Sequence, residues 1–284
     1  MKSYTVLAKG RPIPIRDCPL MMGIVNVTPD SFSDGGRFAD PDAALARAEA
    51  LAEAGAALID IGGESTRPGA APVDAAEETR RVVPVVVAVA RRLPGVWVSV
   101  DTSKAIVARR ALEAGARLVN DVTALGDPSM AEVLRDHNAP AVLMHKKGDP
   151  RTMQANPVYG DVAAEIAAFF EERLAYAAAR GLPRSHFLLD PGLGFGKTTA
   201  HNVAILRRMD EFHRFGLPLL IGASRKSFIG RLLGGEATPL PPSEREEGSL
   251  AVHLWAAARG ARVLRVHDVR ATARALRLWR ALAG

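Results

Sequence analysis

Short apolar segments that end on an acidic residue are the first sign of chemistry in this chain. Residues 96–101 (Val-Trp-Val-Ser-Val-Asp) are too few for a helix and rich in β-branched types, and the segment stops on Asp101. A buried parallel strand is covered on both faces, so a carboxylate at its C-terminal end emerges at the rim of the sheet. The same pattern recurs at residues 57–60, 117–121, 187–190 and 262–268. We therefore expect several strands to carry polar groups to one place.

Two polar loops lie in the N-terminal part of the chain. Residues 26–36 read Asn-Val-Thr-Pro-Asp-Ser-Phe-Ser-Asp-Gly-Gly, a composition that by itself indicates only a turn-rich loop able to cap a helix. Residues 62–69 read Gly-Gly-Glu-Ser-Thr-Arg-Pro-Gly, in which Thr66 and Arg67 offer hydrogen-bond donors to an anion. A surface loop with a solvated arginine is the simpler alternative for the second segment.

A third loop, residues 190–198 (Asp-Pro-Gly-Leu-Gly-Phe-Gly-Lys-Thr), comes close to a nucleotide-binding P-loop. Pro191 occupies the position where that motif has its first glycine. Proline has no backbone N–H and a fixed φ, so it cannot replace that glycine. The loop therefore argues against a P-loop ATPase.

Two segments near the C-terminus are candidate anion sites. Residues 224–227 (Ser-Arg-Lys-Ser) follow a predicted strand and open a predicted helix, where free backbone N–H groups attract a carboxylate or phosphate. Lys226 and Ser227 would reinforce that attraction, although a solvated basic patch is the alternative. Arg265 and His267 alternate on one side of the last predicted strand, which favours a second anion site. His145 and His201 lack such neighbours, so we expect them to be structural.

The composition limits the classes of protein to consider. The chain has 284 residues, of which 48% are hydrophobic and 24% charged, enough to bury a substantial core. No apolar run reaches the roughly 18 residues of a membrane span, and the N-terminus lacks the apolar core of a secretory signal. A single cysteine, Cys18, excludes an internal disulfide. We expect a cytoplasmic protein with no membrane partner.

The net charge of +6 and the pI near 9.8 raise the question of nucleic-acid binding. The arginines, however, are scattered among alanines along predicted helices, without a dense basic run and with few aromatic residues between them. We therefore expect small-molecule substrates and no nucleic-acid partner.

The elements that must position these residues alternate between strand and helix. Strands are predicted at residues 20–27, 57–61, 97–101, 118–122, 141–145, 187–190, 217–223 and 263–267. Helices are predicted at residues 41–54, 74–92, 103–114, 129–136, 162–180, 200–209, 227–233, 245–259 and 269–283.

This order predicts an α/β protein with a single (β/α)₈ TIM barrel over residues 20–284. A doubly wound open sheet is the alternative, but its polar strand ends would cluster at one switch point instead of recurring in nearly every unit. Residues 4–16 alternate weakly around Gly10 and predict a short β-hairpin within an N-terminal extension, residues 1–19. In such a barrel the chemistry lies at the C-terminal ends of the strands.

Together these motifs resemble the dihydropteroate synthase family, in the family's order, from about residue 20 to the C-terminus. The resemblance rests on residues 26–36, 62–69, 99–103, 120–121, 190–197, 222–230 and 265–269. It implies a (β/α)₈ barrel and a transferase of folate biosynthesis, the target of sulfonamides. The implied reaction joins 6-hydroxymethyl-7,8-dihydropterin diphosphate to p-aminobenzoate, releasing pyrophosphate, with Mg²⁺ on the diphosphate. It also suggests a homodimer formed through the later helices.

The resemblance implies a role for particular residues. The pterin ring would be held by Asp101, Asn120, Asp190, Lys226 and Arg265, with the guanidinium of Arg265 stacked on its face. The diphosphate would be held by Arg265, His267 and, through Mg²⁺, Asn26. The p-aminobenzoate pocket would comprise Thr66, Arg67, Pro68, Phe195, Lys226 and Ser227.

Because diphosphate is already a good leaving group, we hypothesise a dissociative, SN1-like substitution. Diphosphate departs first, Asp101 stabilises the cationic dihydropterin methylene, and the aromatic amine then attacks. Lys226, Asp34 and Arg67 complete the expected catalytic set, and the first two loops, with Phe32, Asp34 and Arg67, are expected to close over the site and exclude water.

Two other functions remain open from the residues. A methyltetrahydrofolate–corrinoid methyltransferase would share the pterin-holding Asp and Asn positions, but it has no need of the anion sites around Lys226 and Arg265. A catalytically silent pterin-binding protein would be expected to have lost at least one of the candidate catalytic residues, which are all present. The two lysines within residues 144–150 and the proline-rich residues 238–242 depart from the family without touching its motifs.

Overall fold

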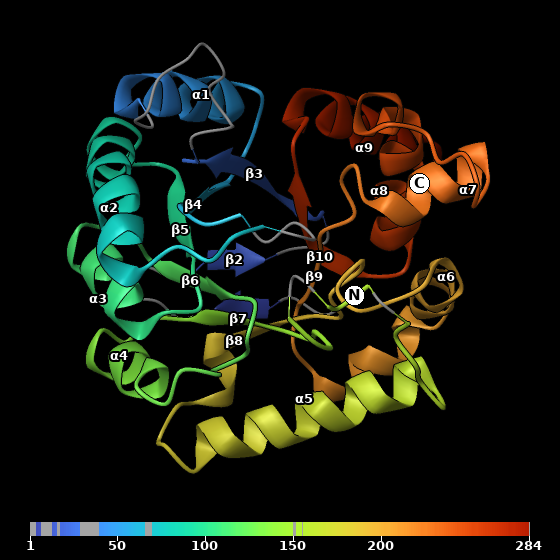
Figure 1. The fold of residues 1–284 in the computed structure, drawn as a ribbon. Coiled ribbons are helices and arrows are strands. Elements are labelled where there is room, and N and C mark those ends of the chain that lie inside the picture. The colour runs from blue at the N-terminus through green and yellow to red at the C-terminus, as the bar shows by residue number, and fades with distance from the viewer. Residues whose placement is uncertain are drawn as a thin grey trace.

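The computed structural model describes residues 4–6, 13–15, 18–28, 40–65, 70–149, 152–154 and 156–283. In this part of the chain, parallel strands close into a barrel in the order β10-β3-β4-β5-β6-β7-β8-β9, and helices surround it (Figure 1). The barrel strands are β3 (Leu20–Asn26), β4 (Leu58–Gly62), β5 (Trp97–Asp101), β6 (Leu118–Asp121), β7 (Ala141–Met144), β8 (Phe187–Asp190), β9 (Leu219–Ile221) and β10 (Ala261–Val266).

The helices that follow these strands cover the outside of the barrel. They are α1 (Pro41–Glu53), α2 (Ala75–Arg92), α3 (Ala105–Glu113), α4 (Met130–Asp136), α5 (Val162–Ala178), α6 (Thr199–Arg207), α7 (Ser227–Gly234), α8 (Glu246–Ala258) and α9 (Val269–Ala283). Several are preceded by an N-cap residue, whose side chain accepts a hydrogen bond from a backbone N–H of the first turn that has no partner within the helix. Asp40 caps α1, Asp74 caps α2, Asp161 caps α5, and Thr198 forms a capping box with His201 at α6.

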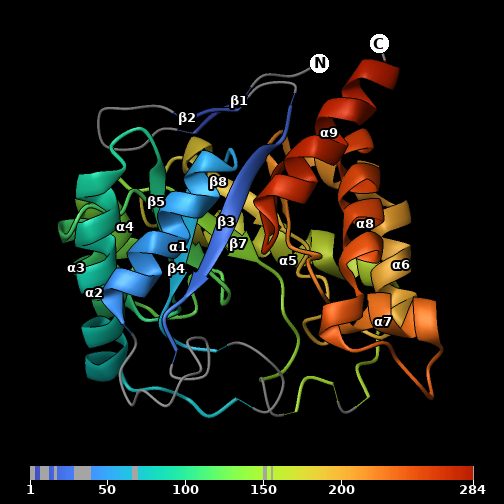
Figure 2. The same cartoon turned by 90° about the horizontal axis from the view of Figure 1, so that it is seen from above.

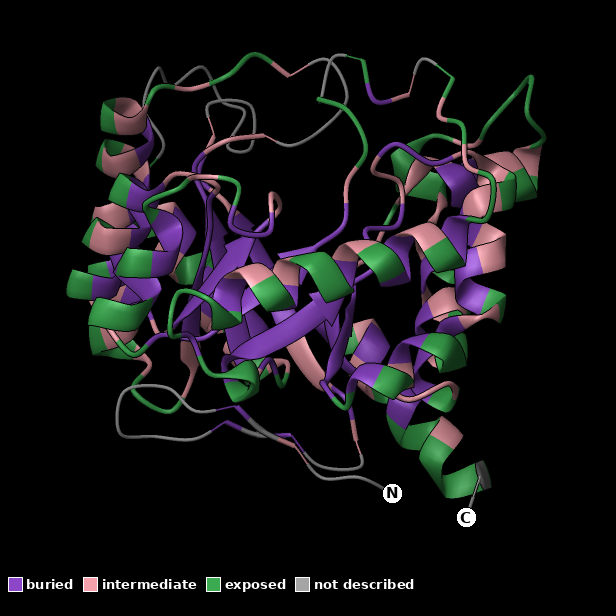
Figure 3. Cartoon of the chain, turned by 90° about the horizontal axis from the view of Figure 1, so that it is seen from below, coloured by how far each residue is buried: buried purple, intermediate pink, exposed green. Residues whose placement is uncertain are grey.

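Alternation along each strand divides the core into two regions. Outward-facing residues such as Ile59, Val100 and Leu189 pack against the helices in one large cluster. Inward-facing residues in the first half of the strands, such as Leu58 and Leu188, form a second apolar cluster inside the barrel. Figure 3 shows the result, with the barrel strands mostly buried and the exposed residues concentrated on the surrounding helices and loops.

The N-terminal hairpin closes one end of the barrel. Strands β1 (Tyr4–Val6) and β2 (Ile13–Ile15) pair antiparallel, and the buried side chains Val6, Ile13 and Ile15 join the inner apolar cluster. The hairpin lies at the end from which β3 starts (Figure 2). This end is therefore filled with hydrocarbon, and an inner site is left at the opposite, C-terminal end of the strands.

The predicted barrel and hairpin are confirmed, because β10 pairs in parallel with both β9 and β3 and so closes the sheet. The prediction of a strand over residues 217–223 is too long, since the structure has only Leu219–Ile221. Pro218, which has no N–H to donate to a ladder, precedes it. None of the helices in the described ranges is long and apolar enough to span a membrane.

Candidate active site

Polar side chains replace the apolar ones where the barrel strands end. The strand register places Gly62 beside Asp101 and Asp101 beside Asn120, so these three positions lie at one level of the barrel. Asp60 lies two residues below Gly62 on the same face of β4, and Arg265 reaches the same level from β10. The sequence motifs predict this convergence for Asp101, Asn120 and Arg265.

Arg265 connects the strands through two carboxylates. Its Nε lies 2.6 Å from Oδ2 of Asp60, and its Nη2 lies 2.7 Å from Oδ2 of Asp101. Asn120 donates from Nδ2 to the same oxygen of Asp60 over 2.9 Å. Burial opposes the charge on Arg265, but Asp60 and Asp101 outweigh it and raise its pKa. Arg265 is therefore a permanent cation inside the barrel, fixed in position by two acids.

Three ionisable groups of the site have pKa values that burial shifts toward neutrality. Burial raises the pKa of Asp101 to about 7, against the opposing effect of Arg265. Burial, together with Arg265, lowers the pKa of Lys226 to about 8. Burial likewise raises the pKa of Asp190, which accepts a 2.7 Å hydrogen bond from the backbone N–H of Gly192. Such shifted acids and bases are typical of functional sites.

Lys226 and Ser227 stand at the start of α7, on a turn that α8 holds in place. Arg225, in the turn, has a left-handed φ of 58°. Its backbone N–H donates to Oγ of Ser249 over 2.9 Å, and its carbonyl accepts from Nη1 of Arg245 over 3.0 Å. The Nζ of Lys226 lies 3.9 Å from the centre of the Phe195 ring, which brings the β8 and β9 loops together. These contacts place two predicted p-aminobenzoate residues, Phe195 and Lys226, side by side.

His267 follows β10 and lies against the same turn. Its Nδ1 is 2.9 Å from Oγ of Ser224, and its backbone N–H donates to the same hydroxyl over 3.2 Å. Asn26 ends β3, in register with Gly62, and so belongs to the same rim. Asn26 and His267, which with Arg265 are predicted to hold the diphosphate, therefore both lie at the C-terminal end of the barrel.

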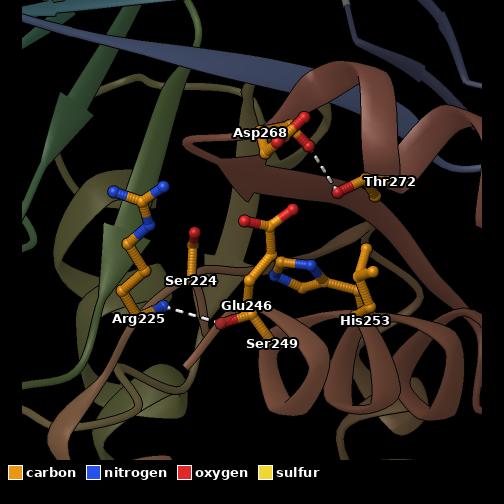
Figure 4. Close-up of a pocket in the computed structure, with 8 residues that line it drawn as sticks. Ser224, Arg225, Glu246, Ser249, His253, Asp268 and Thr272 are labelled. Carbon is orange, nitrogen blue, oxygen red and sulfur yellow. Dashed lines mark hydrogen bonds between the residues drawn. The ribbon is translucent and has the colours of Figure 1, made fainter. Parts of the chain in front are cut away.

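A small cavity lies behind the turn, away from the barrel interior (Figure 4). Its volume is about 10 Å³, and it is lined by Ser224, Arg225, Glu246, Ser249, Leu250, His253, Asp268 and Thr272. A volume of this size admits about one water molecule and no aromatic ring. Burial lowers the pKa of His253 to about 4, so this histidine is neutral near pH 7. The cavity is therefore part of the support for the turn and not a substrate pocket.

Comparison with known proteins identifies the family. The family model described as "Pterin binding enzyme" matches residues 22–267. The dihydropteroate synthase of Escherichia coli strain K12 is 50% identical over 260 residues, covering 92% of this chain and 90% of that protein. The chain belongs to the dihydropteroate synthase family.

Solved structures of the family superpose closely on this chain. The Yersinia pestis dihydropteroate synthase, crystallised with a sulfonamide drug complex, has a TM-score of 0.91 at 47% identity, over 98% of this chain and 99% of that one. The Xanthomonas albilineans enzyme with 4-aminobenzoic acid also gives 0.91 at 47% identity, over 100% of this chain and 99% of that one. The same enzyme has been solved with 7,8-dihydropteroate. The family fold thus covers essentially the whole chain.

Not every predicted site residue can be located. Asp34, Thr66, Arg67 and Pro68, and with them the predicted closure of the first two loops, lie outside the described residues. The described residues on either side of the second loop are held by contacts with each other and with the neighbouring βα units. Glu64 accepts from the N–H of Val73 over 2.9 Å, and Lys104 lies 2.6 Å from both Glu64 and the buried Glu78.

Asp60 is the site residue for which sequence analysis predicted no role. It is fully buried and accepts from both Asn120 and Arg265. The sequence did carry a signal, because Asp60 ends one of the apolar runs. Asp121 ends another run, but it faces the opposite way and accepts from Thr123 and Leu125 of its own loop. This strand therefore contributes Asn120 and not Asp121 to the site, because residue 120 takes the inward position on it.

Proposed function

We propose that this chain joins 6-hydroxymethyl-7,8-dihydropterin diphosphate to p-aminobenzoate, forming 7,8-dihydropteroate and pyrophosphate. One observation carries the proposal: Asp101, Asn120 and Arg265 point inward at one level of the barrel. Asp190 and Lys226 lie at the same end of the barrel. The relatives at about half identity bear the name of this activity, and a family structure contains its product. The chain is accordingly a transferase that forms a C–N bond.

The acids and amides at this end of the barrel suit an aminopyrimidine ring. Asp101 and Asp190 are buried acceptors for the paired N–H donors of such a ring, and the amide of Asn120 offers both a donor and an acceptor. A ring that lacks those donors would leave a buried carboxylate unpaired, at a cost of about 1–3 kcal/mol. Lys226 would donate to the ring oxygen or a ring nitrogen, and Arg265 would lie against the ring face. We therefore assign the pterin to the interior of the barrel.

The diphosphate belongs above the pterin, at the rim. Arg265 supplies a permanent positive charge, and His267, fixed by Ser224, supplies a further ring N–H donor. When the carbon–oxygen bond of the methylene group breaks, its electron pair leaves with the diphosphate. Arg265 and His267 would stabilise the negative charge that develops there.

Mg²⁺, implied by the family, belongs with the diphosphate. Asn26, at the end of β3, offers an amide oxygen, a hard donor of the kind that Mg²⁺ prefers. In the described part of the chain, no group of three or more His, Cys, Asp or Glu side chains is arranged to hold a metal ion. This donor set fits a cation held mainly by phosphate oxygens and water, with Asn26 as a protein contact. When bound, Mg²⁺ would neutralise charge on the departing diphosphate.

The second substrate enters between the β8 and β9 loops. Phe195 and the aliphatic part of Lys226 provide a wall for the aromatic ring. Ser227, at the first position of α7, and the free N–H groups of that helix would receive the carboxylate. The amine then attacks the methylene cation over Asp101, forms the C–N bond and loses a proton. Asp34, Thr66, Arg67 and Pro68 retain the roles that the family resemblance implies.

A product assay tests the proposed function. The purified protein, incubated with the pterin diphosphate, p-aminobenzoate and Mg²⁺, is expected to release pyrophosphate and dihydropteroate in equal amounts. Omission of either substrate should prevent dihydropteroate formation. Methyl transfer from methyltetrahydrofolate to a corrinoid would instead identify a methyltransferase, and pterin binding without turnover would identify a silent binding protein.

The pH dependence of kcat/KM is expected to be bell-shaped, with a maximum between about 7 and about 8. Asp101 acts as a carboxylate, and burial raises its pKa to about 7, so activity rises as the pH passes upward through that value. Lys226 acts as an ammonium, and burial lowers its pKa to about 8, so activity falls above it. Steady-state kinetics across this range test both limbs. A flat profile from about pH 6 to about pH 9 would contradict the two assignments.

A homodimer formed through the later helices is proposed as well. Leu232 and Leu233 of α7 are 57% and 55% exposed, and Trp255 of α8 is 45% exposed, which is typical of a surface that a second copy covers. The double variant Leu232→Arg and Leu233→Arg is expected to sediment at half the mass of the wild-type protein. A wild-type protein that itself sediments as a monomer would refute the proposal.

We place the enzyme in the cytoplasm, in keeping with its single cysteine.

A further inference from the structure

Lys197 is a buried lysine that the proposed chemistry does not use. Its side chain is 1% exposed. Its Nζ lies 2.9 Å from the carbonyl oxygen of Gly192, 3.0 Å from that of Phe195 and 3.0 Å from Nδ1 of His145. The carbonyl oxygen of His145 lies 3.3 Å away, so four acceptors on two separate segments surround one amine. Burying an amine is costly unless such contacts replace its hydration.

The loop that Lys197 holds follows an unusual path. Gly192, Gly194 and Gly196 all have positive φ values, of 68°, 80° and 65°. A Cβ at Gly192 would lie 1.9 Å from the carbonyl oxygen of His145, and one at Gly196 would lie 2.2 Å from that of Lys147. The loop backbone thus packs directly against the segment after β7. This path turns the carbonyls of Gly192 and Phe195 toward the interior, where Lys197 donates hydrogen bonds to both.

The bonds from Lys197 to the two loop carbonyls can form in either protonation state of the amine. Burial lowers its pKa to about 7, and burial with the nearby lysines lowers the pKa of His145 to about 3. An ammonium group donates to both carbonyls and to the unprotonated Nδ1 of His145. A neutral amine still donates to both carbonyls and accepts from that ring nitrogen in its other tautomer. The two carbonyls of the loop are therefore held throughout the working pH range.

The two substrate residues of this loop depend on Lys197 to different degrees. Asp190 ends β8, its carbonyl accepts from the N–H of His145 over 2.9 Å, and its carboxylate accepts from Gly192. The sheet therefore fixes the backbone of Asp190, and Lys197 reaches this residue only through Gly192 and through its charge. Phe195 lies in the middle of the loop, where its backbone is held by the 3.1 Å bond from its N–H to Gly192 and by the bond from Lys197 to its carbonyl.

We propose that Lys197 is a positioning residue for the p-aminobenzoate half of the site, acting through the backbone of Phe195. The inference rests on the proposed function, because it assigns Phe195 to the p-aminobenzoate pocket. Lys197 holds the Phe195 ring against Lys226, so that the second substrate meets a preformed wall. The pterin side of the site depends on Lys197 less, because its residues are anchored in the strands.

The test compares Lys197→Met with Lys147→Met. Lys147 is a neighbouring lysine whose Nζ contacts Val158 and Glu165 instead of the loop carbonyls. Lys197→Met is expected to raise KM for p-aminobenzoate about tenfold, while kcat changes less than about threefold and the calorimetric Kd for the pterin diphosphate changes less than about twofold. Lys147→Met should leave all three values within about twofold of the wild type.

A double-mutant cycle separates positioning from a general structural effect. In a Phe195→Ala background, Lys197→Met should change KM for p-aminobenzoate less than about twofold, because the side chain through which it acts is gone. An unchanged KM in the single variant, an equal loss of pterin binding, or full additivity in the cycle would each overturn the inference. Lys197→Gln, with the same expectations, is used if Lys197→Met does not fold. Activity in the wild type and in Lys147→Met shows in the same experiment that the proposed function stands.

Discussion

Replacement of Asp101 by asparagine is expected to lower kcat about a hundredfold. The carboxylate faces the position assigned to the cationic methylene, and asparagine keeps the shape and the hydrogen-bonding oxygen while removing the charge. One charge pair at about 5 Å with an effective dielectric near 20 is worth roughly 3 kcal/mol, which is on the order of a hundredfold in rate. Because the interaction forms mainly in the transition state, the Kd for the pterin diphosphate should change far less than kcat.

The matched control is Asp121→Asn on the neighbouring strand. Asp121 is a buried aspartate like Asp101, but it accepts from Thr123 and Leu125 and faces away from the barrel interior. Its replacement should lower the free energy of unfolding by about 1–3 kcal/mol and leave kcat within a few-fold of the wild type. Stopped-flow measurement of pyrophosphate release gives kcat for both variants. Full turnover in Asp101→Asn, with normal pterin binding, would contradict the catalytic role.

Replacement of Arg265 by methionine is expected to abolish measurable turnover and to lower the free energy of unfolding by about 3–5 kcal/mol. The change leaves Asp60, which is fully buried, and Asp101 without the cation that both contact. Removal of one partner of a buried ion pair is costly because the remaining charge stays desolvated. Lysine is a poor substitute, since its compact ammonium lacks the planar guanidinium whose separate nitrogens, Nε and Nη2, reach the two carboxylates.

The cost of Arg265→Met should depend on pH in a defined direction. The pKa of Asp101, already raised by burial to about 7, rises further without the guanidinium. A carboxyl group whose pKa is higher in the folded than in the unfolded state destabilises the fold as the pH rises from about 4 through the folded value. Urea unfolding should therefore show a larger loss at pH 8 than at about pH 5. Addition of Asp60→Asn to Arg265→Met should recover part of the loss, and a pH-independent loss would contradict the ion-pair account.

The architecture could be predicted from the sequence because local patterns carry it. The strand runs are short and rich in apolar residues, the helices between them are capped, and the polar strand ends recur along the chain. Strand alternation then places Asp101, Asn120 and Arg265 inside the barrel. The same rule, applied residue by residue, separates Asp60 from Asp121, although both end an apolar run. Whether an acid at the end of a strand points into the barrel or toward the helices can thus be decided only once the strand register is known.

The supporting contacts could not be predicted, because they join segments far apart in the sequence. Ser249 binds the turn of Arg225, 24 residues earlier, and Lys197 binds His145, 52 residues earlier. Nothing local marks either partner, since the pairing depends on how neighbouring βα loops pack at the rim. The hairpin was predictable as an element, but its function as a cover for the barrel interior follows only from the contacts of Val6, Ile13 and Ile15.

A crystal structure of this protein with the pterin diphosphate and a p-aminobenzoate analogue tests the account most directly. We expect the pterin ring inside the barrel, within hydrogen-bonding distance of Asp101, Asn120 and Asp190. The diphosphate should lie above it, at Arg265 and His267. We also expect the analogue beside Phe195, with its carboxylate at Ser227. A pterin bound elsewhere, or a diphosphate that contacts neither Arg265 nor His267, would contradict the account.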